Sequence, residues 1–492
     1  MRFLRLSSAL ATAALALTLA ACSDAPDHDA PPTNDASPSH DASPASDAHA
    51  SDAPTRDAHA PDAPAPATCS QQVPSPEPAI LSPDPGGPVA AQMNDVSILF
   101  PLPSHYSDVD QLLPACATGP RGALLPASLY ASVGPIHGST FPDAGPDLAG
   151  PGIAEYANLH VVAMRVDPCF ASLAPAPDGS GCTAQIRLVF QEIYDDNDGF
   201  TFENPTFGTG PAGFDGALHV LYTLTRDEFL ALTRSLVALR EANQGDGGAG
   251  GPLAPHPIIA AQGLTGAMGQ GVERLILQYA GASNLSRVAL LDFSEAFIGW
   301  SFDAFSVSSA ADGSVTPLAI PTLPDAGFPD DAGIFQGVTT GFTEEADAGT
   351  FFVPTFSPAT TIDGGYATLS PPGSNTVTPA TAGAAFEGLV RIENPNDHSP
   401  NTIDCGSCHL ATPTEKEFLL PALSLDDETS PLSFQPDGVH VTRADMAVHY
   451  SQPEVSFGNL HAFSYLARAP SINQRTVNET ARVVEYLNAL PE

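Results

Sequence analysis

The chain has 492 residues, with 56 acidic against 17 basic side chains and a formal net charge of −39. This acidic balance, without any basic cluster, argues against a nucleic-acid partner, because the phosphate backbone would be repelled. The length is sufficient for two or three domains with cores of their own.

The first 21 residues have the pattern of an export signal. Arg2 and Arg5 precede an apolar stretch, Leu6 to Leu19, that is too short to cross a bilayer as an ordinary helix. The stretch ends in the letters LAAC, which resemble the lipobox of bacterial lipoproteins. The resemblance implies cleavage before Cys22 and lipid modification of that cysteine. We therefore expect an exported lipoprotein in the outer membrane, facing the periplasm or the cell surface; a plain secretory peptide is the alternative.

The composition of residues 22–68 predicts a disordered linker. From Ser23 to Thr68 the chain uses almost only Asp, Ala, Pro, Ser, Thr and His, and it has no aromatic residue there. Such a segment cannot bury enough apolar surface to offset the entropy lost on folding. We expect a spacer between the membrane anchor and the folded part of the chain.

Residues 69–310 are expected to form a β-rich α+β domain of unknown role. Short segments rich in Val, Ile, Leu and Phe and bounded by Gly, Pro or Asp predict strands. These segments are Val96–Leu102, His160–Val166, Gln185–Ile193, Leu218–Leu224 and Arg287–Phe293. A capping box that begins at Thr225 predicts a helix to about Asn243, and a second helix is predicted over Gly271–Tyr279. Residues 311–380 are rich in Pro and Gly, which indicates a further β segment or an irregular connector.

Four cysteines in this part suit two disulfides in an oxidising compartment. Cys169 with Cys182 would close a short loop between two strands, and Cys69 with Cys116 would tie the start of the folded region. This pairing is one of the three that four cysteines allow.

The sequence DCGSCH contains the pattern Cys-x-x-Cys-His at Cys405, Cys408 and His409. It resembles the haem-attachment motif of c-type cytochromes, in which two thiols form thioethers with haem and the histidine ligates the iron. The resemblance implies one covalently bound haem c. A disulfide-bonded loop and a zinc site with a recruited fourth ligand are the alternatives.

Residues 381–492 are predicted to form a small all-α domain similar to class I cytochromes c. A helix over Ala384–Ile392 is expected to end before Pro395, whereas class I proteins run a continuous helix into the first cysteine. Capping boxes that begin at Thr412 and Thr476 predict two further helices, of which the second is the C-terminal helix.

The second axial ligand of the iron is expected to be Met446, the only methionine after the motif, as the class I resemblance implies. The alternatives are an open position or a histidine, namely His440, His449, His461 or His398. Two protein ligands favour electron transfer, whereas an open position admits peroxide, NO or CO.

The sequence thus predicts a membrane-anchored electron carrier rather than a catalyst, with a redox partner that presents a basic face to the acidic chain. Two other functions stay open. The first is a haem enzyme or a gas or peroxide sensor with an open sixth position. The second is a non-redox binding lipoprotein whose activity lies in residues 69–380.

Overall fold

The computed structural model describes residues 89–133, 156–169, 183–195, 210–213, 216–244, 252–294, 299–318, 335–340, 354–355, 379–396, 398, 405–415, 423 and 460–490. All of them belong to one compact unit, residues 64–492. Several predicted features lie outside the described residues: the signal, the linker, Cys22, Cys69, Cys182, His440, Met446 and His449.

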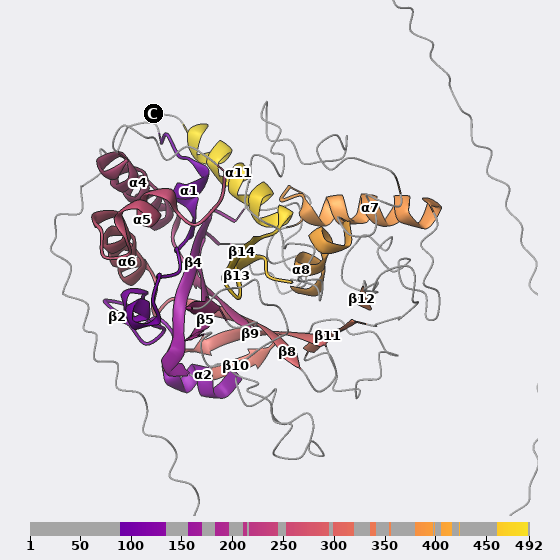
Figure 1. Cartoon of the computed structure of the whole chain (residues 1–492), viewed down its shortest axis with the longest axis horizontal. Helices are drawn as coiled ribbons and strands as arrows, with labels where there is room; N and C mark the ends of the chain where they lie inside the picture. The colour runs from indigo at the N-terminus through magenta and orange to yellow at the C-terminus, as the bar shows by residue number, and fades with distance from the viewer. Residues whose placement is uncertain are drawn as a thin grey trace, which may run out of the picture. The chain divides into compact units, whose positions relative to one another are not determined.

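A ten-stranded antiparallel sheet organises the described chain (Figure 1). Its main path runs in the order β1 (Ser97–Leu99), β4 (Leu159–Asp167), β5 (Gln185–Asp195), β7 (Ala217–Thr223), β8 (Leu285–Ser294), β9 (Gly299–Ser309), β11 (Phe335–Thr340) and β12 (Pro354–Thr355). Two more strands flank this path, since β6 (Pro211–Gly213) pairs with β5 and β10 (Ser314–Pro317) pairs with β9. The predicted β-rich α+β character is therefore confirmed, and so are the five predicted strands; the structure adds that they belong to one large antiparallel sheet. The described strands between residues 311 and 380 extend this same sheet.

Besides the sheet, the described chain before β8 contains α-helices, two 3₁₀ helices and a hairpin of two short strands. They are α1 (Met93–Val96), η1 (Tyr106–Gln111), β2 (Thr118–Gly119), β3 (Gly122–Ala123), α2 (Ala127–Val133), η2 (Tyr156–Asn158), α4 (Arg226–Asn243), α5 (Pro257–Gln262) and α6 (Ala267–Tyr279). The capping box predicted at Thr225 is confirmed. Its hydroxyl accepts from the Glu228 backbone N–H at 3.2 Å, and the Glu228 carboxylate accepts from the Thr225 N–H at 2.8 Å. Both orphan donors at the start of α4 are thus satisfied.

The two faces of the sheet differ in chemistry. On β7, Leu218, Val220 and Tyr222 point to one face, where they join a core that includes buried residues of α4 and α6. His219 lies on the opposite face. Arg165 and Arg187, paired across β4 and β5, share that opposite face, because Arg187 is paired with Leu221 of β7, two residues after His219. One face therefore carries ordinary apolar packing and the other carries buried polar groups.

The C-terminal part of the chain covers the polar face. It comprises α7 (Pro379–Glu393), α8 (Cys405–Thr414), β13 (Phe463–Leu466), β14 (Ala469–Ile472) and α11 (Gln474–Asn488). The all-α prediction for residues 381–492 is wrong at β13 and β14, which form a hairpin. Its residue Tyr465 exchanges two hydrogen bonds with the Gln191 side chain on β5, at 2.9 and 2.8 Å. Phe463 and Tyr465 on this short strand are aromatic residues of the kind enriched in strands, and both are buried.

Two predicted helix starts are also wrong. Helix α11 begins three residues early, because Asn473 accepts from the Thr476 N–H at 2.8 Å and takes the N-cap position. Helix α8 begins at Cys405, while Thr412 lies inside it and donates to Glu393 at 2.6 Å. The predicted helix over Ala384–Ile392 is confirmed within α7.

The hairpin and α11 share a hydrophobic core with the large sheet, through residues such as Phe463, Tyr465 and Val477. The domain boundaries predicted at residues 310 and 380 stay predictions. None of the described helices is both long and apolar enough to cross a membrane.

Candidate functional site

Helix α8 brings the three residues of the predicted attachment motif together. Cys405 and Cys408 lie one helical turn apart and therefore on the same side of α8. Neither is in a disulfide, and each is partly accessible to solvent. His409 follows directly and is buried. Helix α8 packs against α7 and against strands β9 and β11 of the large sheet, so the motif faces the interior of the protein.

The His409 ring is held by contacts from three separate elements. Its Nδ1 atom forms a short hydrogen bond with the backbone carbonyl of Leu460, just before β13. The ring centroid lies 5.5 Å from that of His219 on β7 and 5.1 Å from that of Phe302 on β9. A ring whose Nδ1 donates to a carbonyl carries its lone pair on Nε2, which is the arrangement typical of metal-binding histidines.

Both rings are neutral at physiological pH. Burial lowers the pKa of His409 to about 4. Burial also lowers the pKa of His219 well below its ordinary value of 6.5, with a further contribution from the nearby His409. Neutral imidazole is the form that binds metals. The pKa of the Cys408 thiol is raised to about 11, mainly by burial, so this thiol is protonated at neutral pH.

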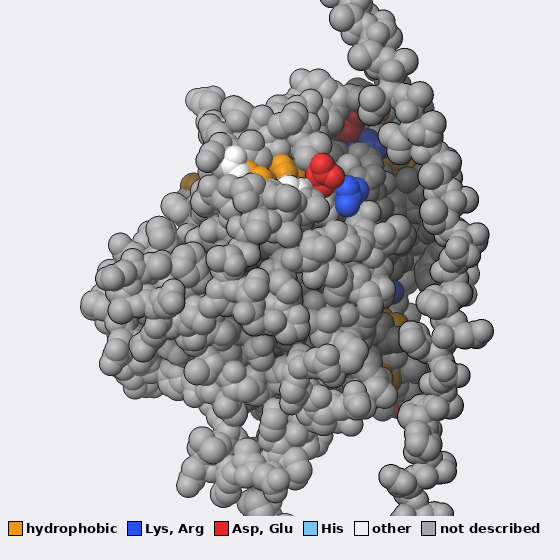
Figure 2. Space-filling model, turned by 90° about the vertical axis from the view of Figure 1, so that its right-hand side faces the viewer, with side chains coloured by type: hydrophobic (Ala, Val, Ile, Leu, Met, Phe, Trp, Pro, Cys, Tyr) orange, Lys and Arg blue, Asp and Glu red, His pale blue; other side chains and the backbone are white. Residues whose placement is uncertain are grey.

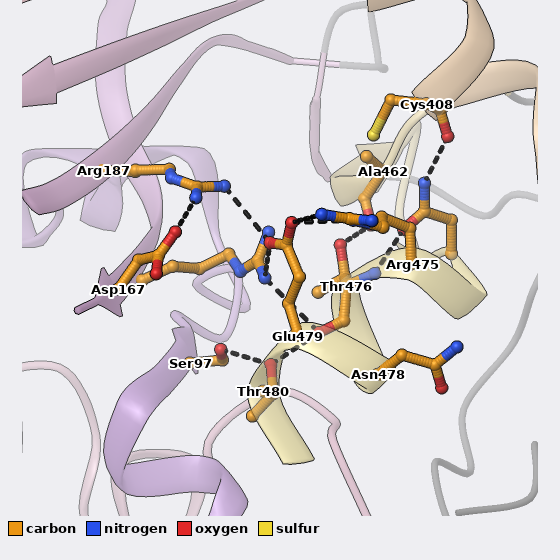
Figure 3. A network of polar contacts seen from close by, with 12 residues as sticks. Ser97, Asp167, Arg187, Cys408, Ala462, Arg475, Thr476, Asn478, Glu479 and Thr480 are labelled. Carbon is orange, nitrogen blue, oxygen red and sulfur yellow. Dashed lines mark hydrogen bonds and ion pairs between the residues drawn. The ribbon is translucent and has the colours of Figure 1, made fainter. Parts of the chain in front are cut away.

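A network of buried charges lies beside Cys408 (Figure 3). Glu479 of α11 accepts from Arg165 at 2.7 Å, from Arg187 at 3.3 Å and from Arg475 at 2.7 Å. Arg187 also pairs with Asp167. Three guanidinium groups thus meet two carboxylates, which leaves an excess of positive charge around Glu479. The Arg165 Nε–H is buried and has no hydrogen-bond partner among the described residues.

The same network fastens the C-terminal segments to one another. Arg475 donates to the backbone carbonyls of Ile392 at 2.7 Å and Asn394 at 3.1 Å, where α7 ends, and to that of His398. The Asn473 side chain donates to the carbonyl of Cys408 at 3.0 Å. Helix α11 therefore holds both α7 and α8, and α8 in turn packs against β9 and β11 of the sheet.

Glu479 makes the stability of this arrangement dependent on pH. Burial alone would raise the pKa of Glu479, but the charges of Arg475, Arg187 and Arg165 outweigh it and hold the pKa below its ordinary value of 4.5. A carboxylate with a depressed pKa contributes stability above its unfolded pKa and loses that contribution as the pH falls through the folded value. We expect the difference in unfolding free energy between the wild type and Glu479→Gln to shrink from about pH 6 to about pH 3. Urea titrations at a series of pH values would measure it; a difference that stays constant would contradict the assignment.

Two side chains of this site are not completely buried. Cys408 and His219 both retain accessible surface, although their pKa shifts show that they lie deep in the protein. Beside His219 on the same face are Ala289 and Ala304, its cross-strand neighbours on β8 and β9. The methyl groups of these two alanines take up less volume on this face of the sheet than larger side chains would.

These residues fit a covalently attached haem. Cys405 and Cys408 would form the thioethers, and His409 would offer Nε2 to the iron. Arg165, with its unpaired Nε–H, and the excess positive charge around Glu479 suit the two propionate carboxylates of the group. No cluster of three or more His, Cys, Asp and Glu side chains suited to a bare metal ion occurs among the described residues.

The other predicted site residues are only partly described. His461 is buried, and its Nδ1 lies 2.8 Å from the Ser464 hydroxyl. His398 is also buried, in the connection between α7 and α8. Cys116 and Cys169 are each bonded in a disulfide, but their predicted partners lie outside the described residues, so the proposed pairing stays a prediction.

Sequence reasoning missed three residues of this site, His219, Arg165 and Arg187, and it placed Glu479 in a capping box instead of an ion-pair network. One signal was available. His219, Arg165 and Arg187 each interrupt a strongly apolar predicted strand, where a charged or titratable side chain needs a buried partner. No protein-family model, curated protein or solved structure matches the chain.

Proposed function

We propose that this chain is a c-type cytochrome that transfers single electrons through one haem bound covalently at Cys405 and Cys408. One observation carries the proposal: two cysteines that form no disulfide and a buried histidine share a turn of α8, and a backbone carbonyl fixes the histidine Nδ1. The absence of a disulfide between the two cysteines does not favour the alternative of a disulfide-bonded loop. The group, when bound, supplies one-electron redox chemistry.

The chain's own residues would fix the orientation and the electrostatic environment of the site. The Leu460 carbonyl orients the His409 ring, and Phe302 packs against it. The positive excess from Arg165, Arg187 and Arg475 would pair with propionates. The burial of His409 keeps its ring largely away from bulk water.

The membrane attachment also belongs to this proposal. Cys22 would carry lipid, and residues 23–68 would let the folded unit reach away from the membrane surface. Such an anchor suits a carrier that exchanges electrons with a membrane-bound or periplasmic partner.

The partner is expected to present a basic face, because the chain carries a net charge of −39. In the view of Figure 2, an acidic and a basic side chain lie next to each other at the centre of the face. The prediction of a basic partner therefore rests on the net charge of the chain.

Electron exchange with a small cationic redox protein should slow as ionic strength rises, because screening weakens the attraction between opposite charges. Between about 10 mM and about 200 mM salt we expect the second-order rate constant to fall by roughly tenfold or more. Stopped-flow absorbance would measure it, with a small anionic protein as the control whose rate should rise. A rate with the cationic protein that is independent of salt would contradict this part of the proposal.

The carrier function itself is tested by redox titration of the purified holoprotein. A carrier gives a single reversible one-electron transition and negligible turnover of hydrogen peroxide. Sustained peroxide consumption at rates well above that of free haem would instead favour the catalytic alternative.

A further inference from the structure

We propose that His219 of strand β7 is the second axial ligand, so that the iron is held between the C-terminal helix α8 and the large sheet. This inference rests on the function proposed above, and it replaces Met446 as the expected ligand. It concerns a residue nearly two hundred positions before the attachment motif.

The distance between the two histidine rings carries the inference. The ring centroids of His219 and His409 lie 5.5 Å apart, and their planes are inclined by 73°. Two imidazoles that bind one iron from opposite sides, at metal–nitrogen distances of about 2 Å, have centroids roughly 6 Å apart. The observed centroid separation is only slightly shorter than this value.

The position of His219 in the sheet suits a ligand. Strand β7 is paired on both sides, and His219 lies between Val189 on β5 and Ala289 on β8. A side chain on an interior strand is held more precisely than one on a loop. Its cross-strand neighbours Ala289 and Ala304 have small side chains, and His219 itself is not completely buried.

His461 is the nearest rival among the described residues, and its place in the chain disfavours it. The residue follows Leu460, whose carbonyl is bonded to His409 Nδ1. The backbone of His461 therefore lies on the Nδ1 side of the His409 ring, whereas the iron would lie on the Nε2 side. The Ser464 hydroxyl, 2.8 Å away, further holds the His461 ring within its own hairpin.

The test compares His219→Ala with His461→Ala in the full-length holoprotein. Wild type is expected to have a low-spin ferric spectrum and, when reduced, to refuse CO, because two protein ligands fill the axial positions. In His219→Ala we expect a high-spin ferric spectrum and rapid CO binding, and added imidazole should restore the low-spin spectrum. His461→Ala should behave like the wild type. A His219→Ala protein that stays low-spin and still refuses CO would overturn the inference, as would CO binding that appears only in His461→Ala.

A second variant tests the same inference if the His219→Ala protein does not fold. His219→Met retains an axial ligand but replaces a nitrogen by a thioether, which raises the reduction potential. We expect a clearly more positive midpoint with the low-spin spectrum kept; an unchanged midpoint would overturn the inference. Covalent haem content, measured on the same samples, separates the two proposals. If every His219 variant keeps its full covalent haem and its coordination is unaltered, only the assignment of His219 as a ligand is refuted. If the wild type itself carries no covalent haem, the proposal that the chain is a cytochrome is refuted.

Discussion

Replacing Cys405 and Cys408 together by alanine is expected to remove all haem that survives acid–acetone extraction. Neither thiol is in a disulfide, and the two lie on one side of α8, a helical turn apart. Thioether bonds need both sulfur atoms, and alanine offers neither. Expression in a host with cytochrome c maturation, followed by haem staining of the denatured protein, would measure the loss.

The matched control for this change is Ser407→Ala, which alters a residue inside the same motif and leaves both thiols in place. It should retain full covalent haem. Haem that stays attached to the double alanine variant would show that another residue forms the bond and would refute the assignment of the motif.

Replacing Glu479 by glutamine should cost about 3 kcal/mol or more of unfolding free energy, because it leaves buried arginines without their shared carboxylate. Glu479 is bonded to Arg165, Arg187 and Arg475, and all four side chains are buried or nearly so. The neutral amide keeps the size of the side chain but cannot balance three guanidinium charges. Equilibrium urea unfolding followed by far-ultraviolet circular dichroism would give the change in free energy.

Glu485→Gln is the control on the same helix. Glu485 pairs with Arg482 at 2.8 Å, and both side chains are about a quarter exposed, at 24% and 30%. A partly exposed pair of this kind contributes less than about 1 kcal/mol. Equal costs for the two substitutions would mean that the network around Glu479 does not hold α11 to the sheet.

Much of the large sheet was predictable because its strands carry a local signal. Segments such as Gln185–Ile193 and Arg287–Phe293 are short, apolar and bounded by turn residues, and they appear as β5 and β8 with few changes at their ends. The capping box at Thr225 is equally local, since its reciprocal hydrogen bonds join residues three apart.

The C-terminal region was less predictable because long-range partners decide its local structure. The letters Thr-x-x-Glu at Thr476 have the form of a capping box, but Glu479 is bonded to arginines on β4 and β5, nearly three hundred residues earlier. Asn473 occupies the N-cap position of α11 instead. No pattern within the helix itself distinguishes these two uses of a glutamate.

At the candidate site, too, local features could be predicted from the sequence and long-range contacts could not. The motif at Cys405, Cys408 and His409 is contiguous, so the sequence alone could indicate its chemistry. His219 could not be assigned, because a lone histidine in an apolar strand has no local feature that separates a ligand from a core residue. Only the fold places it against His409.

The most direct test of the whole account is the alkaline pyridine haemochrome spectrum of the full chain, expressed where cytochrome c maturation operates. The account predicts a c-type spectrum with one haem per chain that stays with the protein through acid–acetone extraction. A chain that folds but carries no covalent haem, under conditions in which a control cytochrome matures, would contradict it.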